Sequence, residues 1–242
     1  MSATLPFTQP QFRKEINQLA KVMRTKSPDE LKELMKISDK VAALNVERYR
    51  QIKAPIPLEI GKPALFLFAG DAYQGLDAES LNEEDITFAQ EHLRILSGLY
   101  GILRPLDLML PYRLEMGTRL VGKDFNTLYE YWGNKLTKNI KSLLSSSNEK
   151  GIINLASKEY FSALDFDAIS APVYTMHFKE YKNGTYKFIT YYGKKARGLM
   201  TRFIIKNKLI TPEEVKYFDL DGYHFNPELS GEFDWVFTRG DE

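Results

Sequence analysis

The chain has 242 residues, of which 43% are hydrophobic and 27% charged, and its formal net charge is +1. This composition is typical of an ordinary globular protein, and the absence of cysteine excludes disulfides, thiolate metal sites and cysteine nucleophiles. No apolar run reaches the ~20 residues that span a bilayer, and the first residues lack the pattern of a signal peptide. We therefore expect a cytoplasmic protein without a membrane partner, in which any affinity for nucleic acid comes from a local basic patch.

The first third of the chain contains signals for two helices and a strand. Ser27-Pro28-Asp29-Glu30 supplies an N-cap, an N1 proline and an N3 acid, and therefore predicts the start of a helix. A second helix is predicted from Ser38 to Arg50. The continuous apolar run from Ala64 to Ala69 predicts a buried strand.

A longer helix is predicted from Asn82 to Leu99, because its apolar residues recur at spacings of three and four. Gly98 and Gly101 are expected to end it. Leu96 to Met109 then joins two helical runs through a glycine-containing turn, which predicts a helix-hairpin-helix. In that motif the backbone N–H groups approach a DNA phosphate, and nearby arginines such as Arg104 and Arg113 add charge. The alternative is a helix end and a tight turn with structural arginines.

The second half of the chain contains signals for a strand and a hairpin. Ile152 to Leu155 predicts a short strand. Val173 to Tyr192 predicts a β-hairpin that turns at Lys182-Asn183-Gly184, because Asn-Gly is a strong hairpin-turn signal. No internal repeat and no domain boundary is visible.

The hairpin leads into a basic stretch, Tyr191 to Lys208, which contains six Lys or Arg and no Asp or Glu. Its apolar residues have helical spacing, so it predicts an amphipathic helix with a basic face. Lys194 and Lys195 follow Gly193 and are expected in the first turn, where cations oppose the helix macrodipole. A bound phosphate would reverse that cost. The alternative is a solvated basic face on a helix that packs on the core.

Polar side chains after the two predicted strands form a candidate pocket, because ligands collect beyond the carboxyl ends of strands in α/β sheets. With Arg113 and Lys194 they would offer acid, base and anion-binding groups, so an enzyme is a second hypothesis. In an alternative interpretation, Ser157 caps a short helix. The candidate pocket residues are Asp71, Tyr73, Glu115, Asn154, Ser157, Lys158 and Glu159.

Metal and cofactor signals are weak in this sequence. The three histidines are far apart, and none has a carboxylate–histidine pattern of metal-ligand spacing. There is no phosphate-binding loop, dinucleotide fingerprint or nucleophile elbow. We therefore predict no metal site and no cofactor.

Several strings occur together in this chain: LSGLYGILRPLDLM at 96–109, PYRLEMG at 111–117, NLAS at 154–157 with EYF at 159–161, and KKARGLM at 194–200. Together with ISDK at 37–40 and GDAYQG at 70–75, they resemble the signature segments of the bacterial YaaA family of peroxide-stress proteins. The family normally begins with a short strand and a Ser-Pro-Ala-Lys segment, which does not precede Leu5 here. If that strand borders a pocket, we expect this chain to lack one wall and one lysine of it.

The resemblance implies a fold and a role. The implied fold is a single mixed α/β domain, residues 1–242, with a mixed sheet, surrounding helices, a helix-hairpin-helix and a basic cleft that binds DNA. The implied role is protection from hydrogen peroxide by keeping unincorporated iron low, which limits oxidative DNA damage. The hairpin would fall on Gly98 to Gly101, and the basic element on Lys194, Lys195, Arg197 and Arg202.

Two functional hypotheses follow. The first is a DNA-binding protein that contacts mainly phosphates; if it neutralises six to ten of them, its affinity should fall by roughly 10³ to 10⁵ between 50 and 200 mM salt. The second is an enzyme that acts on a phosphorylated or nucleotide-like small molecule held by the same lysines. Neither hypothesis predicts an oligomeric state.

Overall fold

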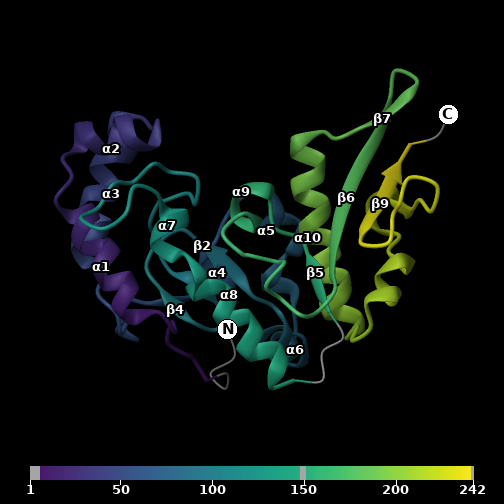
Figure 1. Cartoon of the computed structure of the whole chain (residues 1–242), viewed down its shortest axis with the longest axis horizontal. Coiled ribbons are helices and arrows are strands. Elements are labelled where there is room, and N and C mark those ends of the chain that lie inside the picture. Colours follow the sequence, from purple (N-terminus) through teal and green to yellow (C-terminus); the bar gives the residue numbers. More distant parts are fainter. Residues whose placement is uncertain (1–5, 148–150, 241–242) are drawn as a thin grey trace. The chain divides into compact units, whose positions relative to one another are not determined.

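A computed structural model describes residues 6–147 and 151–240 of the chain (Figure 1). The fold is mixed α/β, as predicted, and the chain forms two compact units, each built from separate segments of the sequence. The assignment of a single domain stays a prediction. The start of the chain, where the family's first segment was sought, lies outside the described residues. Unit 1 comprises residues 1–68, 90–138 and 157–165, and unit 2 comprises residues 69–89, 139–156 and 166–242.

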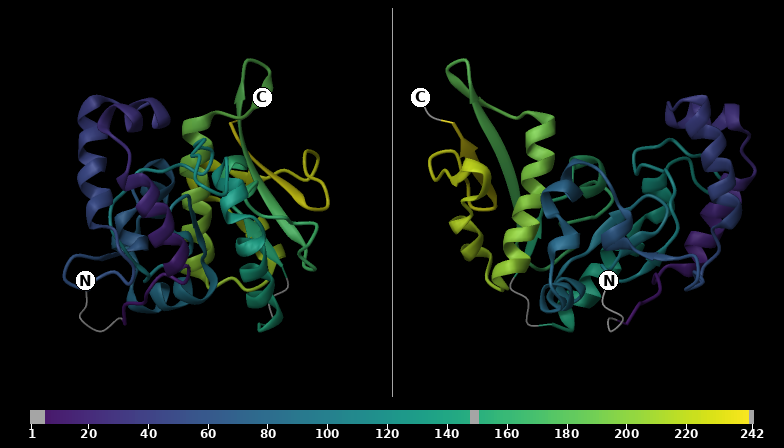
Figure 2. Two further views of the ribbon diagram at one scale, coloured as in Figure 1. Left: turned by 60° about the vertical axis from the view of Figure 1, so that its left-hand side comes forward. Right: turned by 180° about the vertical axis from the view of Figure 1, so that it is seen from behind.

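Three helices begin unit 1: α1 (Arg13–Arg24), α2 (Pro28–Met35) and α3 (Asp39–Gln51). The predicted capping box at Ser27 is confirmed, because its hydroxyl accepts a hydrogen bond from the Glu30 N–H at 3.2 Å and the Glu30 carboxylate accepts one from the Ser27 N–H at 2.7 Å. Both α1 and α2 pack against α3, and the three helices lie together in the purple part of Figure 2.

The strand predicted from Ala64 to Ala69 is wrong. Residues Ala64–Leu67 form a single helical turn, α4, which directly follows β1 (Lys62–Pro63). The backbone N–H groups of Ala64 and Leu65 donate to the carbonyls of Asp107 and Pro105, each at 2.9 Å. These bonds hold the run against the segment that contains β4 (Leu108–Met109). A short apolar run suits either a buried strand or a buried helical turn, and here tertiary hydrogen bonds decide between them.

The helix predicted from Asn82 to Leu99 is too long. Helix α6 (Glu83–His92) ends early, and the chain continues into two antiparallel strands, β2 (Ile95–Ser97) and β3 (Gly101–Leu103). Residues 95–103 therefore form a β-hairpin in the segment where the helix-hairpin-helix was predicted. Ile95, Ile102 and Leu103 of this hairpin are buried in unit 1, whereas Leu96, which continued the helical spacing, is only partly buried.

Unit 2 contains a mixed sheet with the strand order β5-β6-β9-β8, and β7 pairs with the end of β6. The β5–β6 and β6–β9 pairs are parallel, and the β6–β7 and β8–β9 pairs are antiparallel. The predicted hairpin is confirmed at its turn, where Asn183 and Gly184 have φ values of 54° and 76°, but its second strand ends at Lys187 and does not reach Tyr192. The strands are β5 (Ile152–Asn154), β6 (Val173–Lys182), β7 (Thr185–Lys187), β8 (His224–Phe225) and β9 (Asp234–Arg239).

Helix α10 (Thr190–Asn207) covers one face of this sheet and lies beside β6 in both figures (Figures 1 and 2). Alternate residues of the central strands face it, Met176 and Phe178 from β6 and Trp235 and Phe237 from β9. Met200 of α10 is fully buried among them. The predicted amphipathic helix therefore has its apolar side in the core of unit 2.

A close helix contact fixes the position of α10 within unit 2. It packs on α5 (Asp71–Leu76), and each helix has a glycine at the contact. A Cβ atom at Gly198 would overlap the carbonyl oxygen of Ala72, and one at Gly75 would overlap the carbonyl oxygen of Lys195. The two backbones can touch only because neither position has a side chain.

The remaining elements connect these parts. Among the described residues, no helix is long and apolar enough to cross a membrane. The elements are α7 (Leu128–Trp132) and α9 (Lys158–Phe161) in unit 1; α8 (Asn134–Ser145), which continues from unit 1 into unit 2; and the 3-10 helices η1 (Ala78–Ser80), η2 (Pro212–Tyr217) and η3 (Leu220–Gly222) in unit 2.

Candidate nucleic-acid interface

Helix α10 begins earlier than the sequence pattern suggested. Its first residue is Thr190, so Lys194 and Lys195 are its fifth and sixth residues and lie beyond the first turn. Gly193 does not start the helix. It makes room for the ring of Phe188, whose edge occupies the place of a Cβ atom. The predicted position of the two lysines in the first turn, opposite to the macrodipole, is therefore wrong.

Several cations of α10 are neutralised within unit 2. Lys195 pairs with Asp221 at 3.5 Å. Lys206 donates to Asp85 at 2.8 Å, and Lys208, just after the helix, donates to the other oxygen of the same carboxylate. These three lysines therefore contribute less net charge to the surface than the sequence suggests.

Asp85 is the buried centre of that cluster. Burial alone would raise the pKa of this carboxyl, but hydrogen bonds from Lys206, Lys208 and the Asn82 N–H lower it from 3.8 to about 2. Asn82 and Asp85 also cap each other's backbone N–H groups at the start of α6, at 3.1 and 2.9 Å. The cluster thus joins the end of α10 to the start of α6.

Arg202 has a structural role rather than a free surface position. Its guanidinium donates to the carbonyls of Leu76 and Asp77, both at 3.1 Å, and to the Ser80 hydroxyl at 2.6 Å. These carbonyls lie at the C-terminal end of α5, where a cation complements the helix dipole. The geometry gives Arg202 protein partners in place of the phosphate that the sequence suggested.

Two cations in the first half of α10 have no ion pair among the described residues: Lys194, which is exposed, and Arg197, which is half-buried. The Arg197 guanidinium lies 5.9 Å from the centre of the Phe188 ring. Burial lowers the pKa of Arg197 from its ordinary value, and no acidic neighbour opposes this shift. A guanidinium stays protonated in spite of such a shift, so Arg197 is a partly desolvated cation without a carboxylate partner.

The acid-free stretch is longer than the one first recognised. It extends from Tyr181 to Pro212 and adds Lys182 and Lys187 from the β6–β7 hairpin. Both side chains are exposed, and neither forms an ion pair in the part of the chain that the structure describes. The sequence itself could have identified these two lysines, because the absence of acidic residues continues through the Asn-Gly turn to Tyr181 in β6.

The predicted hairpin glycines are not available to a phosphate. Gly98 and Gly101 are buried in unit 1. The Trp132 indole N–H donates to the Gly98 carbonyl at 3.0 Å, and a Cβ atom at Gly101 would lie 2.8 Å from the same indole. Gly101 therefore makes room for the Trp132 ring, and Gly98 makes room for the backbone of Leu114, whose carbonyl oxygen would lie 2.3 Å from a Cβ atom there.

The two candidate arginines near this hairpin have acidic partners. Arg104 pairs with the buried Asp107 at 2.9 Å, which also accepts from the Arg104 backbone N–H at 2.8 Å. Arg113 pairs with Glu115 at 3.0 Å, and both of these side chains are about half exposed. Arg104 is therefore a structural arginine, as the alternative interpretation proposed, rather than a candidate for phosphate contact.

The predicted pocket residues are distributed over the two units. In unit 1, Glu159 accepts from the Gly117 N–H at 2.8 Å, and Lys158 is exposed. Ser157 precedes α9 as its N-cap, as the alternative interpretation predicted, although its side chain makes no capping hydrogen bond. Glu115 pairs with Arg113 as described above.

In unit 2, Asn154 closes the turn after β5. Its side chain accepts from the Ala156 N–H at 3.0 Å and donates to the Thr175 hydroxyl at 3.3 Å. Asp71 and Tyr73 lie in the short helix α5 and not at the end of a strand. The pocket thus remains a prediction. It was inferred from two strand ends, and one of them, the end of the strand predicted from Ala64 to Ala69, is not present.

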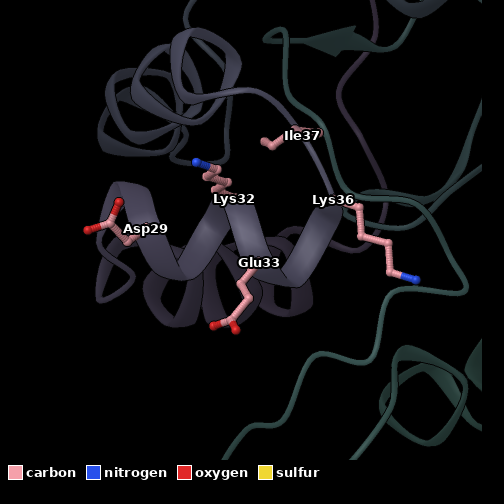
Figure 3. Close-up of a pocket in the computed structure, with 5 residues that line it drawn as sticks. All are labelled: Asp29, Lys32, Glu33, Lys36 and Ile37. Carbon is pink, nitrogen blue, oxygen red and sulfur yellow. The ribbon is translucent and has the colours of Figure 1, made fainter.

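A shallow surface hollow lies on α2, away from the predicted binding residues in the sequence. Figure 3 shows that its acidic and basic side chains point in different directions and do not converge on a common centre. Among residues 6–147 and 151–240, no group of three His, Asp or Glu side chains could hold a metal ion. The hollow is lined by Asp29, Lys32, Glu33, Lys36 and Ile37.

These observations define a mixed α/β protein with an acid-free basic segment on the surface of unit 2. The chain belongs to the peroxide stress protein YaaA family, whose model matches residues 1–229. It is 48% identical over 232 residues to a protein of Hahella chejuensis, and these residues make up 96% of this chain and 91% of that relative. It is 47% identical over 239 residues to a protein of Aliivibrio fischeri, covering 99% and 92%. Both relatives bear the name UPF0246 protein, which states no activity.

Proposed function

We propose that the protein binds DNA, mainly through phosphates and without reading the bases of a duplex. One observation carries the proposal: the acid-free segment from Tyr181 to Pro212 presents cations that no carboxylate of the described residues neutralises. Such cations release counterions from DNA when they contact it, and this release supplies most of the non-specific affinity. The cations are Lys182, Lys187, Lys194 and Arg197.

Arg197 adds a physical reason for an anionic ligand. A partly buried guanidinium has lost some hydration without gaining an ion pair, and a bound phosphate would restore the lost interactions. Lys194 lies three residues earlier in α10, so the two side chains emerge from neighbouring positions of one helix face. A phosphate between them would be held by two cations.

The proposed cellular role follows the family name, peroxide stress protein. We place the protein in the cytoplasm, where DNA binding would serve protection against oxidative, iron-dependent DNA damage. The family name supports the stress role alone, and the link to iron and DNA is part of the proposal.

A salt titration tests DNA binding directly. If the four cations each neutralise one phosphate of a labelled duplex, the slope of log K against log salt is about −3.6, and affinity falls about 150-fold between 50 and 200 mM salt. This is a smaller effect than six to ten contacts would give. Fluorescence anisotropy measures both the affinity and the slope. Undetectable binding at low salt would refute the proposal.

A matched pair of double variants locates the contact. Lys194→Ala/Arg197→Ala removes one lysine and one arginine from α10, and the slope should become shallower by about 2. Arg13→Ala/Lys14→Ala removes the same two charges from α1, where both side chains are exposed, and it should leave the slope unchanged. Equal effects of the two variants would show that the affinity depends on overall charge and not on α10.

The second candidate is an enzyme that acts on a phosphorylated or nucleotide-like small molecule. The position of Arg197 favours this enzyme, because a single half-buried guanidinium can bind the phosphate of a small molecule as well as a phosphate of DNA. This candidate predicts that nucleotides or sugar phosphates raise the melting temperature, since a ligand stabilises the folded state that binds it. A broad panel without any shift would argue against it.

A further inference from the structure

Three aromatic side chains are exposed where the β6–β7 hairpin leads into α10. Phe188, Tyr191 and Tyr192 are 54%, 53% and 39% exposed. They lie within one short stretch of the acid-free segment, residues 188–192. Exposed rings that gather in one place mark a binding surface more often than scattered ones do. The rings contribute little to the core of unit 2, so packing alone does not explain them.

The rings are held in place by their neighbours. The edge of Phe188 fits against Gly193, and the Arg197 guanidinium lies 5.9 Å from its centre. Tyr191 and Tyr192 contact each other edge to face, with centres 5.4 Å apart. Arg239 of β9 lies 4.7 Å from the centre of Tyr192. The rings therefore present ordered surfaces, and binding to them costs less conformational entropy than binding to mobile side chains.

Cations outnumber carboxylates around the rings, and the two carboxylates near Tyr192, Glu180 and Asp221, are both paired with Arg239. Lys187 precedes Phe188, Lys194 lies one helical turn after Tyr191, and Arg197 lies beside Phe188. None of these three cations has a carboxylate partner in the described part of the chain. An occupant that fits both features has planar groups that stack and a backbone that carries negative charge. A single-stranded nucleic acid has both, whereas a duplex keeps the faces of its bases stacked inside.

We propose that Phe188, Tyr191 and Tyr192 form a stacking platform for the unpaired bases of single-stranded DNA, whose phosphates contact Lys187, Lys194 and Arg197. This inference rests on the proposed DNA binding and extends it, because it names the form of DNA that this surface prefers. Stacking on a protein ring tolerates any base, so the platform gives a preference for single strands without a preference for sequence.

The test compares a labelled 12-nucleotide oligo(dT) with a labelled 20-base-pair duplex by fluorescence anisotropy. Tyr191→Leu keeps an apolar side chain but removes the ring, and it should weaken oligo(dT) binding about 5- to 150-fold, the range for one lost stacking contact. Duplex binding should change by less than twofold. Tyr191→Phe keeps the ring and should retain the affinity for oligo(dT).

Tyr217 supplies a matched control, because its side chain is 79% exposed in the same unit but lies outside the acid-free segment. Tyr217→Leu should leave both affinities unchanged, and melting temperatures will show that all variants fold. If Tyr191→Leu binds oligo(dT) as the parent protein does, or loses duplex and oligo(dT) binding equally, the platform is refuted while DNA binding stands. If the parent protein binds neither probe, the proposed function itself fails.

Discussion

The buried carboxylate of Asp85 gives a sharp prediction about stability and pH. Its pKa is about 2 in the folded protein and 3.8 in the unfolded chain. A folded pKa that lies below the unfolded one stabilises the fold at pH values above 3.8, and the stabilisation is lost as the pH falls toward 2. The difference corresponds to about 2 kcal/mol at pH 7, of which about 1 kcal/mol is lost at pH 3.

Asp85→Asn removes the charge and keeps the shape of the side chain. The ammonium groups of Lys206 and Lys208 then face a neutral amide, whose single carbonyl oxygen replaces two carboxylate oxygens. We expect a loss of about 2 to 3 kcal/mol at pH 7, less than for a fully buried pair, because both lysines are partly exposed and keep some hydration.

Urea unfolding at pH 7 and at pH 3 measures this loss. The gap in unfolding free energy between the parent protein and Asp85→Asn should shrink by about 1 kcal/mol at the lower pH, because protonation then removes the same charge from the parent. Asp124→Asn, at an exposed position, should show almost no gap at either pH. A gap of equal size at pH 7 and pH 3 would refute the account of Asp85.

Three further predictions concern packing and capping. Gly198→Ala should destabilise the protein by about 3 kcal/mol or more, because the new methyl group would overlap the carbonyl of Ala72. Gly231→Ala is the control and should change stability little, because nothing lies within 4 Å of its Cβ position. Thermal melts will compare the two variants. Ser27→Ala should cost about 1 kcal/mol in urea unfolding, since it removes half of the α2 capping box. Trp132→Phe should lower the free energy of unfolding by about 2 kcal/mol in the same assay, because it removes the indole hydrogen bond and leaves volume empty at the β2–β3 turn. A loss below about 0.5 kcal/mol would contradict the role given to Trp132.

Local signals predicted the parts of the fold that local chemistry decides. The capping box at Ser27 and the Asn183-Gly184 turn depend on a few adjacent residues, and both are present. The apolar run at Ala64 depends instead on backbone partners at least 40 residues away, in the segment around Asp107. Its helical turn could not be read from the run itself, because apolar side chains fit either structure.

The candidate site shows the same division. The excess of cations in α10 is visible in the sequence, but their partners are not. Asp85 is 121 residues from Lys206, and the α5 carbonyls that bind Arg202 are similarly distant. The free charge of the helix is therefore smaller than its sequence suggests. The helix also starts earlier than predicted, because Gly193 accommodates the ring of Phe188 and does not end or begin an element.

The contact between Gly75 and Gly198 has a consequence for how α10 can move. A helix rises about 1.5 Å per residue and turns about 100° with each one, so a shift of α10 by one residue would replace Gly198 at the contact by Arg197 or Leu199. Either side chain would strike the backbone of α5, where only a glycine fits. The helix is thus held in a single register on α5, so the direction in which Lys194 and Arg197 face is set by the backbone of a helix that carries neither cation.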